Sequence, residues 1–461
     1  MRCVLDIDAL AHDGRGIARP GGKVCFVDGA LPGERVEARL LARRARFEEW
    51  ITERVLEASP ERVSPTCRLV GRCGGCDLQH LAPEAQRRHG ERVLLDLLAR
   101  QAGLAPERLD PPLVSAPFGY RRRARLAVWT PRRGRPVVGF REAAGRRVVA
   151  VDACPVLAPP LDALPGGLAH EMARLVAPGR VGHLDLALAD GADGRVRPVL
   201  GVHCTGPEPD ADRERWRAFG VDRDAWVFLG GTGTRRCVHA PTGEDPDAGP
   251  AYALPAFDLR LAFEPGDFLQ GNGPVNAALV ARVVALASPA PGQRVLDAFA
   301  GLGNFALPLA RGGAAVEALE AAPELVLRGG RNAEANGLTS VRFALADLAT
   351  EPVPLPPGAF DAAVLDPPRA GARSLVTALA ARGVPRIVYV SCDPATLARD
   401  ARILADAGYR LASLALVDLF PQTHHQEALA CFALPSAGGG RARRRVRPSR
   451  ATRRRCGPGT P

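Results

Sequence analysis

Three cysteines stand close together early in the chain, in the spacing Cys67-x5-Cys73-Gly-Gly-Cys76. Thiolate sulfur is a preferred ligand of soft metals, and three neighbouring thiolates can surround one inorganic centre when a fourth ligand arrives from elsewhere. Cys154, further along the chain, is the candidate fourth ligand. The spacing therefore predicts a cysteine-ligated iron centre, and a tetrahedral zinc site is the alternative.

A cysteine of another kind, Cys392, directly follows the apolar run 386–390. A nucleophilic thiol needs a lowered pKa, and the N-terminus of a helix beginning around Pro394 would lower it. Glu427 ends the polar segment 421–427, just ahead of another apolar run, and a carboxylate there could act as a general base. Taken alone, Cys392 would be an inert buried thiol; together with Glu427 it indicates covalent catalysis.

A glycine-containing turn follows the apolar strand 294–297, in the sequence Ala298-Phe-Ala-Gly301-Leu-Gly303-Asn304. Glycines let backbone amides approach a ligand closely, and a helix N-terminus adds positive potential. By itself the pattern is weak and leaves an NAD-dependent enzyme open. Four acids lie at the ends of successive predicted strands: Asp297, Glu320, Asp347 and Asp366. Acids at these places could bind ribose hydroxyls or an adenine amine, although each one alone could be a helix cap. This series is similar to that of S-adenosylmethionine-dependent methyltransferases.

An alternation of apolar strands and helices after Gly273 must position these residues. The predicted strands are 294–297, 315–319, 341–343, 362–365, 386–390 and 411–417. Continuous apolar strands separated by helices are typical of a mainly parallel sheet covered on both faces. The sequence therefore predicts an α/β, doubly wound, Rossmann-like domain that binds its ligand at the carboxyl ends of the strands.

Two β-rich regions precede this domain. Short apolar runs alternate with Gly and Pro turns from residue 4 to residue 56, a pattern that predicts a small OB-like barrel. A turn-rich stretch with strands at 125–129 and 136–140 follows a predicted helix at 83–101. We expect five parts: a barrel at 1–60, the cysteine loop and helix at 61–110, a central β-rich RNA-binding region at 111–272, the Rossmann-like domain at 273–435, and a disordered Arg-rich tail at 436–461.

The net charge of +11 is unevenly distributed. The tail after Pro435 holds nine arginines and no acid, so residues 1–435 carry a net charge of only +2. Within them, residues 120–147 contain ten arginines and the single acid Glu142. Such a segment can neutralise phosphates and favours contact with nucleic acid, although a solvated strand face in an arginine-biased chain is the alternative.

No run of eighteen apolar residues and no secretory leader pattern is present, so we expect neither a membrane span nor secretion. Eleven cysteines in 461 residues are too sparse for a disulfide scaffold. The expected compartment is therefore the cytoplasm.

The motifs taken together resemble the family of RNA uracil-C5 methyltransferases over residues 1–435. The motifs that carry the resemblance are Asp267-Phe-Leu-Gln270-Gly-Asn272, the turn from Asp297 to Phe305, Asp366-Pro-Pro-Arg369, Ser391-Cys392-Asp-Pro394 and His425-Gln-Glu427. The resemblance implies that Cys392 is the nucleophile and Glu427 the base. It also implies an S-adenosylmethionine site, formed by Gln270, Phe299, Asn304, Glu320, Asp347 and Asp366.

The cysteine quartet resembles the [4Fe-4S] ligands of the ribosomal branch of that family, and residues 4–56 resemble its TRAM barrel. The resemblance thus implies 23S rRNA as the partner, rather than tRNA, and no obligate protein partner. A radical enzyme would leave one iron of its cluster open, whereas Cys154 closes this one. The chain departs from the family at Gly271, Gln426 and Asp393, and the charge of Asp393 would oppose thiolate formation.

The resemblance implies addition of the Cys392 thiolate to uracil C6, attack of C5 on the sulfonium methyl, and removal of the C5 proton by Glu427. The uridine must leave its stack to reach the site. The competing class is an RNA-binding protein with a silent methyltransferase core. The sequence does not identify which uridine is modified.

Overall fold

The computed structural model describes residues 1–132, 134–143, 145–231 and 235–435, so the predicted Arg-rich tail lies outside the described residues. The N-terminal part is a six-stranded sheet in the order β1-β5-β6-β4-β3-β2. Its strands are β1 (Arg2–Asp6), β2 (Ala9–Leu10), β3 (Gly16–Ala18), β4 (Val24–Asp28), β5 (Arg35–Arg43) and β6 (Phe47–Glu57). Alternate side chains such as Val27, Val36 and Trp50 fill its own small core, which explains the short apolar runs of the sequence.

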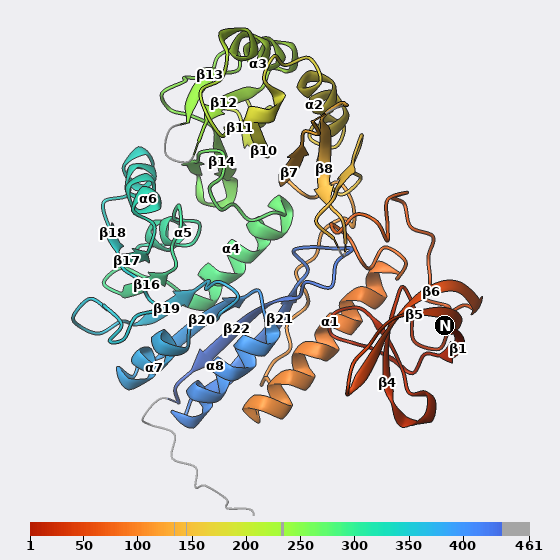
Figure 1. The fold of residues 1–461 in the computed structure, drawn as a ribbon. Helices are drawn as coiled ribbons and strands as arrows, with labels where there is room; N and C mark the ends of the chain where they lie inside the picture. The colour runs from red at the N-terminus through yellow and green to blue at the C-terminus, as the bar shows by residue number, and fades with distance from the viewer. Residues whose placement is uncertain (133, 144, 232–234, 436–461) are drawn as a thin grey trace, which may run out of the picture.

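Helix α1 (Pro83–Leu97) follows the cysteine loop and continues into one wider turn at Leu98–Ala102. It separates the N-terminal sheet from the C-terminal domain (Figure 1). Its residues Leu94 and Leu98 are buried in the core of the C-terminal domain, with Leu404 and Leu414. The predicted helix therefore attaches the cysteine loop to the domain that carries Cys392.

The central region contains a seven-stranded sheet in the order β13-β12-β11-β10-β7-β8-β9. Its strands are β7 (Arg123–Trp129), β8 (Val137–Arg141), β9 (Val148–Ala150), β10 (Val181–Asp190), β11 (Val196–Cys204), β12 (Trp226–Gly230) and β13 (Arg236–His239). Helices α2 (Leu164–Met172) and α3 (Asp210–Arg223) pack on it through Leu168 and Trp216. Both strands predicted in this region are present.

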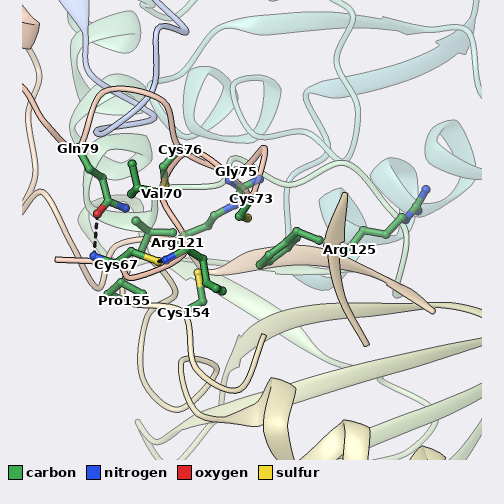
Figure 2. Close-up of a pocket in the computed structure, with 13 residues that line it drawn as sticks. Cys67, Val70, Cys73, Gly75, Cys76, Gln79, Arg121, Arg125, Cys154 and Pro155 are labelled. Atoms are coloured by element: carbon green, nitrogen blue, oxygen red, sulfur yellow. Dashed lines mark hydrogen bonds between the residues drawn. The ribbon is translucent and has the colours of Figure 1, made fainter. Parts of the chain in front are cut away.

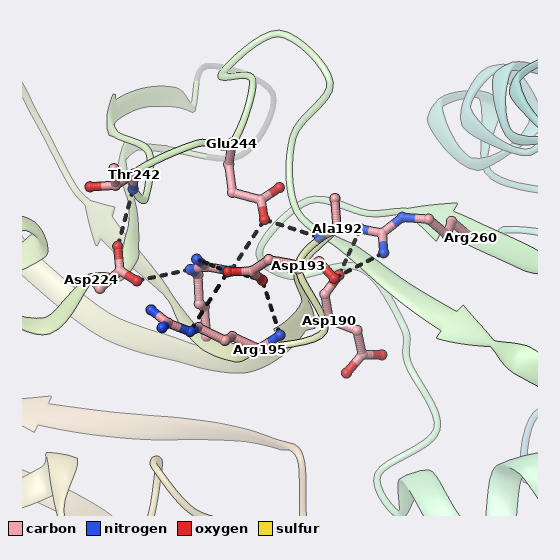
Figure 3. Close-up of polar contacts among 10 residues, drawn as sticks. Asp190, Ala192, Asp193, Arg195, Asp224, Thr242, Glu244 and Arg260 are labelled. Atoms are coloured by element: carbon pink, nitrogen blue, oxygen red, sulfur yellow. Dashed lines mark hydrogen bonds and ion pairs between the residues drawn. The ribbon is translucent and has the colours of Figure 1, made fainter.

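A hairpin of β14 (Ala251–Leu254) and β15 (Leu259–Ala262) joins the central sheet to the C-terminal domain. The Arg260 guanidinium donates to the carbonyls of Gly191 (3.2 Å) and Asp190 (2.6 Å) (Figure 3). Arg197, the second residue of β11, is 5% exposed and is paired with three acids: Asp193 in the β10–β11 turn, Asp224 and Glu244. A buried cation needs such compensation, so this turn is a rigid support for the hairpin.

The C-terminal sheet has the order β18-β17-β16-β19-β20-β22-β21, and only β22 runs antiparallel to its neighbours. Its strands are β16 (Arg294–Ala298), β17 (Ala315–Glu320), β18 (Val341–Leu345), β19 (Ala362–Leu365), β20 (Arg386–Ser391), β21 (Arg410–Val417) and β22 (Glu427–Ala433). Its helices are α4 (Gly273–Ala287), α5 (Ala306–Arg311), α6 (Pro323–Ala335), α7 (Arg373–Ala381) and α8 (Pro394–Asp406). The six predicted strands are all present.

Both faces of this sheet are covered. Val295 belongs to one hydrophobic core and the next residue, Leu296, to a second core on the opposite face. This double burial explains why the strands read as continuous apolar runs rather than as alternating ones. In the part of the chain that the structure describes, no helix is long and apolar enough to span a membrane.

Candidate active site

The predicted cofactor residues lie along one edge of the C-terminal sheet. Adjacent strands β18, β17, β16, β19 and β20 are parallel, so their carboxyl ends meet at that edge. Glu320 is the last residue of β17, Asp366 follows β19, and Cys392 follows β20. The sheet thus brings the predicted cofactor acids and the predicted nucleophile to the same edge, as expected for a doubly wound fold.

Glu320 connects two of the loops at this edge. Its Oε2 accepts a hydrogen bond from the Gly301 N–H (3.0 Å), and its Oε1 accepts from the backbone of Ala321 and Ala322. Gly303 has φ +97°, and a Cβ there would lie 2.2 Å from the Leu307 side chain, so only glycine fits. Oε2 accepts the one hydrogen bond from Gly301 and keeps a second lone pair, which leaves Glu320 able to accept from a ribose hydroxyl.

The Asn304 side chain is hydrogen-bonded to neighbouring side chains of the protein. Its amide exchanges two hydrogen bonds with the Asn276 amide (2.9 and 3.0 Å), and its Oδ1 also accepts from the Tyr252 hydroxyl (3.1 Å). Asn276 on α4 and Tyr252 on β14 were not identified from the sequence, because they lie outside the motifs that contain glycine and acids. They tie the glycine turn to the hairpin and to α4.

Burial disfavours the charged form of the carboxyl groups at this edge. Burial raises the pKa of Asp366 to about 7, and a hydrogen bond from the Gln270 side-chain amide (3.1 Å) partly opposes the rise. Asp297 is 1% exposed; burial, and then the charges of Asp366 and Glu320, raise its pKa well above the usual range. A cationic ligand would stabilise the ionised form of these acids. The edge is therefore suited to a positively charged cofactor.

The Cys392 thiol is held in its neutral form. Burial, and then the charges of Glu427 and Asp366, raise its pKa to about 11, and Arg369 opposes this rise. Helix α8 does begin at Pro394, but the predicted lowering of the thiol pKa is wrong, because desolvation and two acids outweigh the helix N-terminus. Asp393 is the N-cap of α8.

Sheet register brings Glu427 to Cys392. In the antiparallel pair of β20 and β22, the register ends with Ser391 opposite Ala428. Cys392 directly follows Ser391 and Glu427 directly precedes Ala428, so the two residues flank the same end of this pair, and the charge of Glu427 acts on the Cys392 thiol. Glu427 is 7% exposed, and burial followed by the charge of Asp366 raises its pKa well above the usual range, while Arg369 lowers it. A buried carboxylate of raised pKa is a strong base.

Arg369 is a cation at this site whose role the sequence did not specify. Its guanidinium lies 3.0 Å from Nδ1 of His425. Burial, and then the charges of His424 and Arg369, lower the pKa of His425 to about 4, so the imidazole is neutral. Arg369 is thus positioned to offset negative charge that develops beside Cys392 and Glu427.

The four predicted metal ligands line one cavity of about 210 Å³ (Figure 2). Cys67, Cys73 and Cys76 come from the loop before α1, and Cys154 comes from the segment after β9. Burial raises the pKa of Cys76 to about 12. No group of three or more histidine, cysteine or acidic side chains in the described ranges is arranged to hold a single metal ion. The structure thus gathers the thiols around a common space without converging them on a point.

Two sets of arginines can be distinguished in the arginine-rich segment. Arg122 and Arg125 form ion pairs with Asp190 and Asp185 respectively, and the Arg125 side chain remains 54% exposed. The exposed set lies in and around the two turns that follow β7 and β8, next to the cysteine loop: Arg132, Arg135, Arg141, Arg146 and Arg147. The candidate phosphate-binding surface is therefore smaller than the sequence indicated.

Comparison with known proteins agrees with this geometry. Residues 257–432 match the family model described as tRNA (Uracil-5-)-methyltransferase, and residues 4–47 match the TRAM domain. The chain is 45% identical over 436 residues to the 23S rRNA (uracil(1939)-C(5))-methyltransferase RlmD of Alkalilimnicola ehrlichii, an alignment that covers 92% of this chain and 95% of the relative. The chain belongs to the RNA uracil-C5 methyltransferase family.

Further comparisons extend this result. The RlmD of Pseudomonas putida is 44% identical, over 93% of each chain. The tRNA (uracil-54, C5)-methyltransferase of Pyrococcus abyssi, solved with S-adenosyl-L-homocysteine, has the same fold with a TM-score of 0.69 at 24% identity, covering 94% of this chain and 100% of that one. Family membership confirms the expected enzyme class, its methyl donor S-adenosylmethionine and the methyltransferase fold with an N-terminal TRAM domain. It decides against the NAD-dependent alternative.

Proposed function

We propose that this enzyme methylates C5 of a uracil in 23S rRNA, at the position equivalent to 1939, the position named for the relatives with which it shares almost its full length. The observation that carries the proposal is that Cys392 and Glu427 flank the last β20–β22 pair, Ser391 and Ala428, at the sheet edge that holds the acids Asp297 and Asp366. The exposed arginines and the N-terminal sheet would bind the surrounding phosphates. A ribosomal RNA substrate implies that the reaction takes place in the cytoplasm.

The proposed chemistry uses Cys392 and Glu427 in turn. The Cys392 thiol would lose its proton to solvent, and its sulfur would bond to C6 while the electrons of the C5–C6 double bond move into the ring as an enolate, which makes C5 electron-rich. S-adenosylmethionine, when bound, would supply an electrophilic methyl group that C5 takes up as the bond from this methyl to the sulfonium sulfur breaks, which leaves a neutral thioether. Glu427 then accepts the proton from C5, the C6–S bond breaks, and the thiolate leaves with the bonding electrons. Arg369 offsets the negative charge that the ring carries between these steps.

The cofactor roles are also proposals. Glu320 would accept from the ribose hydroxyls, Asp347 would accept from the adenine amine, and Asp366 would face the cationic end of the molecule, supported by Gln270. Phe299, whose backbone has φ +65°, and Asn304 would shape the loop between them. Calorimetric titration of S-adenosylmethionine into the purified chain tests this assignment, and loss of binding in Asp366→Ala with retained folding is expected.

A [4Fe-4S] cluster in the cysteine cavity completes the proposal. Four thiols spread around about 210 Å³ suit a multi-atom cluster better than one tetrahedral ion, and Arg121 at the cavity wall would balance cluster charge. The cluster would brace the loop, because the chemistry moves no electron. Anaerobic purification should give a brown protein with a broad visible absorption; a colourless protein that contains zinc would contradict this assignment.

Substitution of the nucleophile tests the main proposal. Cys392→Ala should abolish transfer of labelled methyl from the cofactor to a 23S rRNA transcript, whereas Cys204→Ala, in the central sheet, should retain transfer. Transcript containing 5-fluorouridine should trap the wild-type chain on a denaturing gel, because fluorine cannot be removed as the proton is. Methyl transfer by Cys392→Ala would refute covalent addition. Mapping 5-methyluridine in rRNA from a strain that lacks this gene would test the position.

A further inference from the structure

The loop that leads into Glu427 is bound to the cysteine loop. This base loop, residues 418–426, connects β21 to β22. The backbone N–H groups of Asp77 and Leu78, which directly follow Cys76, both donate to the carbonyl of Gln422 (3.1 and 3.0 Å). The Asp77 carboxylate accepts from the His424 N–H (2.8 Å) and contacts the His424 ring. Two segments far apart in sequence thus share several hydrogen bonds at one point.

Gln422 is the residue most dependent on these contacts. It is 2% exposed and has φ +73°, a backbone conformation that costs a non-glycine residue about 1 kcal/mol or more. Gln86, on the first turn of α1, holds it from the other side: Gln86 Oε1 accepts from the Gln422 N–H (2.9 Å), and Gln86 Nε2 donates to Gln422 Oε1 (3.1 Å). The surrounding contacts therefore maintain a conformation that the chain would otherwise avoid.

The base loop continues from this point to the catalytic centre. The His424 ring lies 4.5 Å from the His425 ring, and His425 contacts Arg369. Phe420 packs edge-on against His425, and Arg121, which lines the cysteine cavity, lies over Phe420 at 5.7 Å. Contacts therefore run without a break from the cavity wall to the cation beside Cys392 and Glu427.

We propose that Asp77, Gln86 and Gln422 form a latch through which the cysteine loop positions Glu427 for removal of the C5 proton. The inference rests on the proposed function. These three are positioning residues: they act on the base loop and do not touch the reacting atoms. Cys392 lies between β20 and α8, outside the base loop, so the latch acts on the proton-removal step and not on the addition step. It also gives the cysteine cavity a part in a reaction that transfers no electron.

Gln86→Ala in the full chain tests the latch, with Gln101→Ala as its matched control, since Gln101 is exposed beyond the end of α1. We expect kcat for Gln86→Ala to fall about tenfold or more, because small displacements of a catalytic group have effects of this size. Binding of the transcript by filter assay should stay within about twofold of wild type. A denaturing gel should show the methyl-labelled protein–RNA adduct accumulating on ordinary transcript. Gln101→Ala should match wild type.

The outcomes separate the latch from the function. An inactive wild-type chain would refute the proposed function. An active wild type, with Gln86→Ala unchanged in kcat and free of adduct, would overturn the latch, as would a loss of activity that follows weakened RNA binding. If Gln86→Ala does not fold, variants of Asp77 provide the test. Asp77→Ala should lower kcat and accumulate the adduct. Asp77→Asn keeps the acceptor for the His424 N–H, so it should restore kcat and remove the accumulated adduct. Equal activity of these two variants would overturn the proposal.

Discussion

The sheet-edge site and the cysteine cavity are built in different ways. Asp366, Cys392 and Glu427 each begin or directly follow a strand, so the register of one sheet fixes their spacing. The cavity cysteines lie in irregular segments between elements, and the sheet does not set their separation. The first site is therefore preorganised by the fold, whereas in the second the proposed cluster would hold the cysteines in place. Substitutions in the first should change rate, and substitutions in the second should change stability.

Glu427→Gln gives the largest expected effect in this comparison. The glutamine keeps the shape and cannot accept the C5 proton, so kcat should fall by about 10²- to 10⁴-fold, the usual contribution of general base catalysis. The methylated adduct should accumulate on ordinary transcript. Stability should be unchanged or slightly higher, because the carboxyl of Glu427 is destabilised by burial in its ionised form. A large fall in melting temperature would show that this edge depends on its acid for folding.

Cys154→Ser should show the opposite pattern. Loss of one ligand should remove iron and visible absorption and should lower Tm by about 5 °C or more, since each 1 kcal/mol corresponds to about 2–4 °C in domains of this size. The fall in kcat should be smaller than for Glu427→Gln. Cys204→Ser, a buried thiol of the central sheet, is the control and should keep its iron. Iron content equal to wild type in Cys154→Ser would remove Cys154 from the ligand set.

The pH dependence of kcat/KM distinguishes the two regions again. Both Cys392 and Glu427 must lose a proton to act, and burial raises both pKa values, that of Cys392 to about 11. The rate should therefore rise with pH across the range from about 6 to 10, with a slope of up to about two log units per pH unit where both groups are still protonated. Asp366→Asn removes a charge that raises the Cys392 pKa, so it should move the rise to lower pH. A profile that falls above pH 8 would contradict the thiolate.

The sequence predicts the strands well, because burial on both faces leaves apolar runs that few other structures explain. It also places Cys392 and Asp366 at one edge, since parallel strands share their carboxyl ends. It does not show that β22 inserts between β20 and β21, so the pairing of Cys392 with Glu427 follows only from the structure. The predicted direction of the shift in the Cys392 pKa was wrong. Burial outweighs the helix N-terminus, and the local sequence does not show that the thiol is buried.

Other polar residues show the same limit. Asn304 is a cofactor residue by motif, yet its amide is paired with Asn276, 28 residues earlier in the chain. Arg122 and Arg125 are arginines of a basic segment, yet each is paired with an acid on β10. The composition gives only the number of arginines. The ion pairs in the folded chain show which of these arginines remain available to RNA. The latch residue Gln422 carries no motif at all.

Asp393→Asn has the smallest expected effect and isolates one charge beside the nucleophile. The Asp393 carboxylate accepts from the N–H groups of Ala395 (2.9 Å) and Thr396 (3.0 Å), so its role is to cap α8. Asparagine caps helices almost as well, and the lost charge at a helix N-terminus is worth about 0.3–1 kcal/mol. Tm should therefore fall by no more than a few degrees, and the pH profile of kcat/KM should stay in place.

The pH profile should not move in Asp393→Asn, because the acids that raise the Cys392 pKa are Glu427 and Asp366. The Asp393 carboxylate is instead directed into the first turn of α8. The same pH titration on Asp366→Asn and Asp393→Asn compares a charge that faces the thiol with one that faces the helix. A shift toward lower pH in Asp393→Asn as large as that in Asp366→Asn would show that sequence proximity, rather than orientation in the fold, sets the thiol pKa.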